Sequence, residues 1–111
     1  MKISFNKLEK EYQRNKNLFD KTIQKVLNSG SFILGEEVEK FEKSFSKYIG
    51  VKFTIGVGNG MEAIQISLLS LGIGKGDEVI TTSLSAGATG LAIEAVGAQP
   101  IFVDIDDYFH I

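Results

Sequence analysis

Three short apolar runs alternate with two helical patterns in the second half of this chain. The apolar runs cover residues 53–57, 78–82 and 100–104, and the helical patterns cover residues 61–71 and 86–96. Strands that alternate with helices pair in parallel, because each crossover returns the chain to the same end of the sheet. The sequence therefore predicts an α/β fold that contains a partial β-α-β-α-β parallel unit.

The first half of the chain has helical periodicity and no strand pattern. Apolar residues recur at helical intervals over residues 8–27, and Gly30 follows as a helix stop. After a short apolar connector, a second stripe (Val38, Phe41, Phe45 and Tyr48) predicts a helix that ends at Gly50. We therefore expect a helical segment over residues 1–52, followed by the start of an α/β domain over residues 53–111.

Several kinds of site are disfavoured by composition. The 111 residues include no cysteine, and His110 is the only histidine, so neither a disulfide framework nor a histidine-based metal site is expected. No apolar run reaches the length of a membrane span, and the N-terminus lacks the apolar core of a secretory signal. These features predict a cytoplasmic protein with no metal and no membrane partner.

Charge is distributed unevenly along the chain. Residues 1–52 carry 11 Lys and Arg against 7 Asp and Glu, whereas residues 53–111 carry 1 against 7. The lysines of the basic half alternate with glutamates at helical spacing, which is typical of a solvated helix face, so no nucleic-acid partner is expected. Beyond residue 52 the only lysine is Lys75.

A glycine-rich turn over residues 56–60 precedes the helical pattern at 61–71. Free N–H groups and the positive end of a helix dipole suit a phosphate, although such a turn also needs glycine for its dihedral angles alone. The dinucleotide fingerprint fails because Met61 stands where its third glycine belongs, and no P-loop Gly-Lys-Ser/Thr follows. A mononucleotide or a phosphorylated cofactor stays open as the ligand.

An ordered series of motifs runs through nearly the whole chain. Its members are Phe32-Ile-Leu-Gly35-Glu, Phe41-Glu42, Tyr48-Ile-Gly50, Ile55-Gly-Val-Gly-Asn-Gly60, Glu62-Ala63, Leu71-Gly-Ile-Gly74, Gly76-Asp-Glu-Val-Ile80, Ala88-Thr89, Ala92-Ile93, Gly97-Ala98 and Phe102-Val-Asp-Ile-Asp106. This series resembles the N-terminal part of the DegT/DnrJ/StrS nucleotide-sugar aminotransferases. The resemblance implies the large domain of a pyridoxal-phosphate (PLP) enzyme with the aspartate-aminotransferase fold.

The resemblance also implies where the cofactor binds. The turn before the first large-domain helix contributes to the phosphate site, which here corresponds to Gly60, Met61 and Glu62. Many relatives have a hydroxyl residue at the position of Met61, and many place an aromatic ring over the cofactor at the position of Ala86. The departure at Met61 weakens the expected site without excluding it. A methyl group at residue 86 offers contact without a stacking face, and because other relatives have small residues there, this departure is interpreted as a trait of a subgroup.

No catalytic residue is expected within the 111 residues. The lysine that joins the cofactor covalently and the acid that pairs with its ring nitrogen lie downstream of the matching segment in relatives. Lys75 is expected in a surface turn instead. Asp104 and Asp106 follow the last apolar run and are expected to form turns more often than to touch a ligand, and Phe32 is expected to pack in a core.

The functional hypothesis is therefore the front part of an aminotransferase that uses PLP to move an amino group, usually from glutamate, to a nucleotide-linked keto sugar. Relatives act as homodimers, and a few catalyse dehydration instead. Two alternatives stay open: a non-catalytic truncated remnant, and a small module that binds some other phosphorylated ligand.

Overall fold

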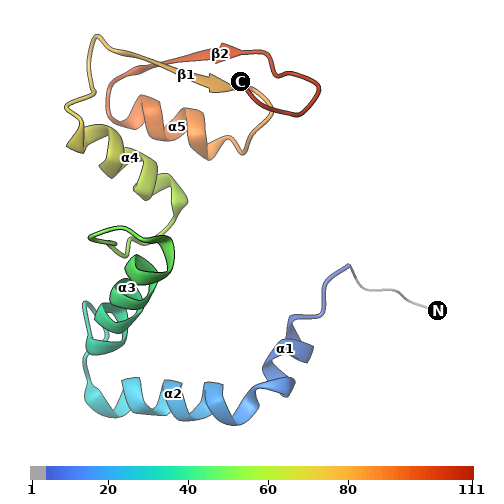
Figure 1. Ribbon diagram of the computed structural model, residues 1–111, viewed down its shortest axis with the longest axis vertical. Helices are drawn as coiled ribbons and strands as arrows, with labels where there is room; N and C mark the ends of the chain where they lie inside the picture. Colours follow the sequence, from blue (N-terminus) through green and yellow to red (C-terminus); the bar gives the residue numbers. More distant parts are fainter. Residues whose placement is uncertain (1–4) are drawn as a thin grey trace. The chain divides into compact units, whose positions relative to one another are not determined.

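The computed structural model describes residues 5–111 of the chain (Figure 1). Along the described residues the order of elements is α1 (Leu8–Arg14), α2 (Lys16–Ser29), α3 (Glu36–Ile49), α4 (Gly60–Ser70), β1 (Glu78–Thr82), α5 (Ala88–Ala95) and β2 (Gln99–Val103). They form two compact units, one that ends at Gly56 and one that begins at Val57. The domain boundary expected between residues 52 and 53 stays a prediction.

The first unit contains α1, α2 and α3. The periodicity over residues 8–27 predicted one helix, but the structure breaks it at Asn15, which has φ −115° and ψ 18°. The Asn15 side-chain amide donates to the Glu11 carboxylate at 2.8 Å and to the Glu11 carbonyl at 3.3 Å. Asparagine competes with the helical backbone in this way, which explains the break. Across it, the Tyr12 hydroxyl donates to Asp20 at 2.8 Å.

The predicted helix ends in this unit are confirmed. Gly30 and Gly50 follow α2 and α3 with φ of 67° and 79°, the left-handed conformation that glycine adopts without a steric cost. The predicted stripe on α3 is also present, with the rings of Phe41 and Phe45 stacked 5.5 Å apart. These rings are 58% and 41% exposed, so the stripe is not covered within the unit.

The second unit confirms the predicted parallel α/β arrangement. β1 and β2 pair in parallel, with Glu78 opposite Gln99 and Thr82 opposite Val103, and α5 forms the crossover between them. The small core consists of Ala92, Ile93, Ala98 and Thr81, which are all buried. α4 packs against α5, and α5 in turn packs against both strands (Figure 1).

Residues 53–57 do not form the predicted strand. Within the described residues the sheet has two strands, and the polar groups of this segment bond to α3 instead. The Gly56 N–H donates to the Glu42 carboxylate at 2.7 Å, and the hydroxyls of Ser46 and Thr54 lie 2.9 Å apart. An extended segment needs a neighbouring strand to complete a ladder, and none lies beside this one among residues 5–111.

The stripe predicted on α4 is only partly buried. Ala63, Ile64 and Leu68 are half-buried, whereas Ser67 and Leu71 are exposed.

Among the helices that the structure describes, none combines the length and the apolar character that crossing a membrane would require.

Candidate cofactor site

The glycine turn leads into α4 through Asn59, which is the N-cap of that helix. Asn59 has extended dihedral angles (φ −164°, ψ 174°), and its side-chain oxygen accepts a hydrogen bond from the Glu62 N–H at 3.0 Å. Asparagine is a strong N-cap residue because its side chain satisfies an N–H that has no partner inside the helix. The glycine-rich turn over residues 56–60 therefore leads into a defined helix start, as expected.

The Glu62 side chain also forms a hydrogen bond, with the residue before the N-cap. Its carboxylate accepts a hydrogen bond from the Gly58 N–H at 2.9 Å. The pattern is a close variant of the capping box, in which the cap and the third helical residue satisfy each other's N–H groups. The pair of bonds fixes the turn from both sides.

These bonds decide which N–H groups of α4 are open to a ligand. The first four N–H groups of a helix have no partner within it. In α4 the Glu62 N–H donates to the Asn59 side chain, and the Ala63 N–H donates to the Asn59 carbonyl at 3.1 Å. The N–H groups of Gly60 and Met61 have no acceptor among the described residues. A Cβ at Gly60 would meet no atom within 4 Å, so a ligand has access to this backbone.

The four residues expected at the cofactor thus differ in what they offer. Gly60 and Met61 present open N–H groups, whereas the Glu62 N–H already has a partner. Ala86 lies in the turn between β1 and α5, where its methyl group is exposed and its carbonyl accepts from the Thr89 N–H at 3.1 Å. That these residues bind the cofactor stays a prediction.

The turn that contains Ala86 is organised by hydroxyl groups. The Thr82 hydroxyl accepts from the Leu84 N–H at 3.0 Å, and the hydroxyls of Ser85 and Thr89 lie 3.1 Å apart. In Figure 1, α4 and α5 both start on the side of the unit toward which the arrows of β1 and β2 point. This is the side on which ligands bind in parallel α/β sheets.

Lys75 lies at the other end of the strands. It occupies the turn before β1, where the Asp77 carboxylate accepts from the Gly74 N–H at 2.8 Å. The 11 residues of α4, about 16 Å of helix, separate this turn from Gly60. The expectation of a surface turn is confirmed, because Lys75 is exposed.

The acidic residues after β2 form turns. Asp104 accepts from the Ile105 N–H at 2.8 Å, and Asp106 accepts from the N–H groups of Tyr108 and His110 at 2.8 and 2.9 Å. This agrees with the expected role as turn formers. No cluster of three or more His, Cys, Asp or Glu that could hold a metal is present in residues 5–111.

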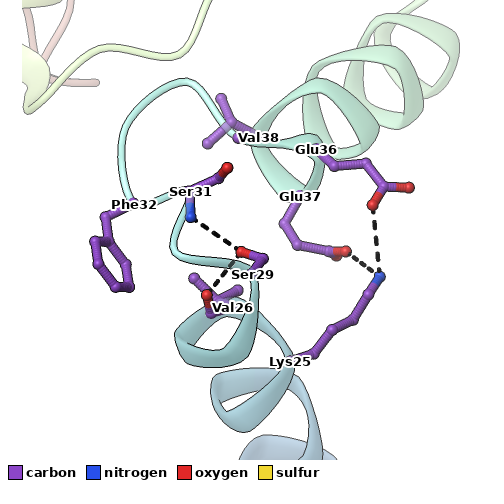
Figure 2. A pocket seen from close by; sticks show the side chains of 9 residues that line it. Lys25, Val26, Ser29, Ser31, Phe32, Glu36, Glu37 and Val38 are labelled. Atoms are coloured by element: carbon purple, nitrogen blue, oxygen red, sulfur yellow. Dashed lines mark hydrogen bonds and ion pairs between the residues drawn. The ribbon is translucent and has the colours of Figure 1, made fainter.

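A second feature, which the sequence did not predict, is a cavity of about 290 Å³ between α2 and α3 (Figure 2). It is lined by Lys25, Val26, Ser29, Ser31, Phe32, Gly35, Glu36, Glu37 and Val38. Phe32 was expected in a core but is 66% exposed. The only sequence signal was the apolar connector over residues 31–35.

The charges at this cavity are paired with each other. The Lys25 ammonium lies 2.6 Å from the Glu37 carboxylate and 3.9 Å from that of Glu36 (Figure 2). The hydrogen bond from Lys25 holds the pKa of Glu37 below its ordinary value, with Lys40 acting in the same direction. Because Lys25, the one cation among the lining residues, faces two carboxylates, the cavity offers no free positive charge to an anionic ligand.

Comparisons with known proteins extend these observations. The model of the DegT/DnrJ/EryC1/StrS aminotransferase family matches residues 13–111. A dTDP-3-amino-3,4,6-trideoxy-alpha-D-glucose transaminase from Micromonospora megalomicea subsp. nigra is 45% identical over 97 residues, which are 87% of this chain and 26% of the relative.

Two solved structures show the same fold. DesV of S. venezuelae aligns with a TM-score of 0.90 and 40% identity over 94% of this chain and 28% of its own. NtdA from Bacillus subtilis, solved with bound cofactor PMP, aligns with a TM-score of 0.75 and 43% identity over 78% of this chain and 20% of its own. The chain thus spans between a fifth and three tenths of the length of these relatives.

Proposed function

The chain belongs to the DegT/DnrJ/EryC1/StrS aminotransferase family, and from this premise we propose that the full-length protein is a PLP-dependent aminotransferase acting on nucleotide-linked keto sugars. The observation that carries the proposal is the family match over residues 13–111, which includes the whole glycine turn and the start of α4. A relative named as a dTDP-sugar transaminase supports the substrate class. Glutamate as the amino donor and a homodimeric assembly are parts of the same proposal.

The geometry of the α4 start fits the phosphate of PLP. Gly60 and Met61 offer two adjacent open N–H groups, and the absence of a side chain at Gly60 lets a ligand approach the backbone. The positive end of the α4 dipole adds a favourable field for an anion. Met61 cannot add a hydroxyl donor, so on this proposal the backbone holds the phosphate.

The proposal also assigns a role to Ala86 and none to Lys75. The Ala86 methyl, exposed at the turn after β1, would contact the cofactor ring without stacking on it. When bound, PLP supplies an electron sink for bond breaking next to the amino group. We assign no catalytic residue within residues 1–111, because Lys75 lies at the opposite end of the strands from Gly60.

Activity of the full-length protein tests the proposal. The protein, saturated with PLP, would be incubated with glutamate and a panel of dTDP- and UDP-linked keto sugars, and products would be identified by mass spectrometry. We expect a nucleotide-linked amino sugar, and 2-oxoglutarate in equal amount. Omitting glutamate serves as the control.

Other outcomes separate the alternatives. Loss of a sugar hydroxyl without gain of nitrogen would identify a dehydratase of the same family. Phosphate binding without either reaction would favour a binding module, and absence of both would favour a non-catalytic remnant. Reduction of the 111-residue polypeptide with borohydride in the presence of PLP should give no stoichiometric label on one lysine; a full label on Lys75 would overturn our assignment of that residue.

A further inference from the structure

The Glu62 carboxylate is bonded outside α4, although it belongs to the first turn of that helix. A carboxylate in the first turn of a helix is attracted to open N–H groups and to the positive end of the dipole. In α4 the Glu62 carboxylate is not bonded to the N–H of Gly60 or Met61; it accepts from the N–H of Gly58, which lies outside the helix. The carboxylate is thereby held one residue before the N-cap Asn59.

Gly58 permits this contact because it has no side chain. A Cβ at residue 58 would lie 2.7 Å from the carboxylate oxygen Oε2 of Glu62 and 3.3 Å from its carboxyl carbon. Gly58 is not among the residues with positive φ, so its backbone conformation is open to alanine. A methyl group at this position would therefore displace the Glu62 carboxylate while leaving the backbone unstrained.

We propose that Gly58 and Glu62 form a latch that keeps the Glu62 carboxylate away from the N–H groups of Gly60 and Met61 and so leaves these two donors to the cofactor phosphate. The inference rests on the proposed function, since it concerns the phosphate site of PLP. Glu62 is thus a positioning residue whose side chain does not touch the cofactor. Its own N–H, which donates to Asn59, is not a phosphate donor in this arrangement.

The position and the charge of the Glu62 carboxylate have separate effects on phosphate binding. The hydrogen bond to Gly58 fixes the position of the carboxylate, and without this bond the carboxylate would compete with the phosphate for the two open N–H groups. The negative charge stays close to the phosphate even when the latch is closed, so it opposes phosphate binding. Glu62→Gln keeps an acceptor for the Gly58 N–H and removes the charge. Gly58→Ala breaks the contact and keeps the charge.

The experiment measures the contribution of the phosphate separately from the rest of the cofactor. PLP and pyridoxal, which lacks the phosphate, would each be titrated into the cofactor-free full-length protein, and the ratio of the two dissociation constants gives that contribution. Variants are Glu62→Gln, Gly58→Ala and, as a matched control, Glu94→Gln on the exposed surface of α5. Thermal melting of each variant shows that it is folded.

We expect Glu62→Gln to increase the preference for PLP over pyridoxal about two- to fivefold, and Gly58→Ala to decrease it by a similar factor. Glu94→Gln should leave the preference unchanged. A decrease with Glu62→Gln, or an unchanged preference with Gly58→Ala, would overturn the latch. If wild type itself binds PLP and pyridoxal equally, the phosphate site fails together with the latch, whereas a large but invariant preference overturns the latch alone.

Discussion

The Glu42 carboxylate accepts a hydrogen bond of 2.7 Å from the backbone N–H of Gly56, fourteen residues further along the chain. A second bond at the same place joins the hydroxyls of Ser46 and Thr54 at 2.9 Å. Together they fasten the extended segment over residues 53–56 to the side of α3. The segment that leads into the glycine turn is therefore held by side chains rather than by a strand ladder.

Removing the hydrogen bond between Glu42 and Gly56 should destabilise the protein. We expect Glu42→Ala in the full-length protein to lower the free energy of unfolding by about 1 kcal/mol, because an N–H bonded to a charged group loses its partner. Glu42→Gln keeps an acceptor and should retain most of the stability. Glu39→Ala is the matched control on the same helix, since Glu39 pairs with Lys43 across 3.7 Å on the surface. Denaturant unfolding measures all three, and equal losses for Glu39 and Glu42 would contradict the fastening role.

Gly97 should resist substitution. It links α5 to β2 with φ 85°, and a Cβ there would lie 3.4 Å from the Lys75 backbone nitrogen. Gly97→Ala is expected to cost about 1–2 kcal/mol, because a side chain strains the left-handed conformation. Gly87→Ala is the control, since Gly87 has φ −54° and open space around it; we expect a change below about 0.5 kcal/mol. Chemical denaturation compares them, and equal costs would argue against the strain.

The ion pairs that Glu36 and Glu37 form with Lys40 of the same helix and with Lys25 of α2 should make stability depend on acid pH. Hydrogen bonds from Lys40 to Glu36 and from Lys25 to Glu37 hold the pKa of each carboxyl below its ordinary value of 4.5. A lowered carboxyl pKa stabilises the fold at pH above 4.5, and this stabilisation disappears as the pH falls through the lowered pKa. The melting temperature should therefore decrease as the pH is lowered below about 4.5.

The double variant Lys25→Met/Lys40→Met isolates this contribution. It removes both cations, so its melting temperature should decline less than that of wild type between about pH 5 and about pH 3. High salt should reduce the difference, because all four side chains are exposed. Parallel pH profiles for wild type and variant would show that these pairs do not contribute.

The 111-residue polypeptide should not fold cooperatively on its own. In residues 5–111 the buried apolar core consists of Ala92, Ile93 and Ala98, while Ile80 and Phe102 on the sheet are 63% and 57% exposed. Burial of a large apolar side chain is worth about 1.5–3 kcal/mol, so leaving several exposed removes the usual margin of about 5–15 kcal/mol. We expect aggregation or a compact state without fixed packing. A dispersed amide NMR spectrum with a cooperative melting transition at the size of a monomer would contradict this.

The features that local sequence determines were predictable. Gly30 and Gly50 end helices because each adopts the left-handed conformation, a local backbone preference of glycine that can be recognised in the sequence. The parallel pairing of residues 78–82 with 99–103 follows from two apolar runs joined by a helix. The turns at Lys75 and Asp106 are likewise formed by near neighbours in the sequence.

The features that depend on competition between partners were not predictable. Asn15 breaks a helix that periodicity alone makes continuous, because its side chain bonds to Glu11. Residues 53–57 have the composition of a strand, but a strand also needs a neighbour, and in the described residues Glu42 and Ser46 take that place. At the candidate site the sequence indicated the α4 start, whereas only the hydrogen bonds show that the Glu62 N–H is already engaged.

Titration of PLP into cofactor-free full-length protein tests the central claim most directly, when Gly60→Val and Met61→Thr are compared with wild type. If the backbone of Gly60 and Met61 holds the phosphate, Gly60→Val should weaken PLP binding at least about tenfold, because the side chain blocks donors to a charged group. Met61→Thr should bind PLP as tightly as wild type or more tightly, since it adds a hydroxyl donor. Equal dissociation constants for Gly60→Val and wild type would contradict the account and move the cofactor phosphate away from the start of α4.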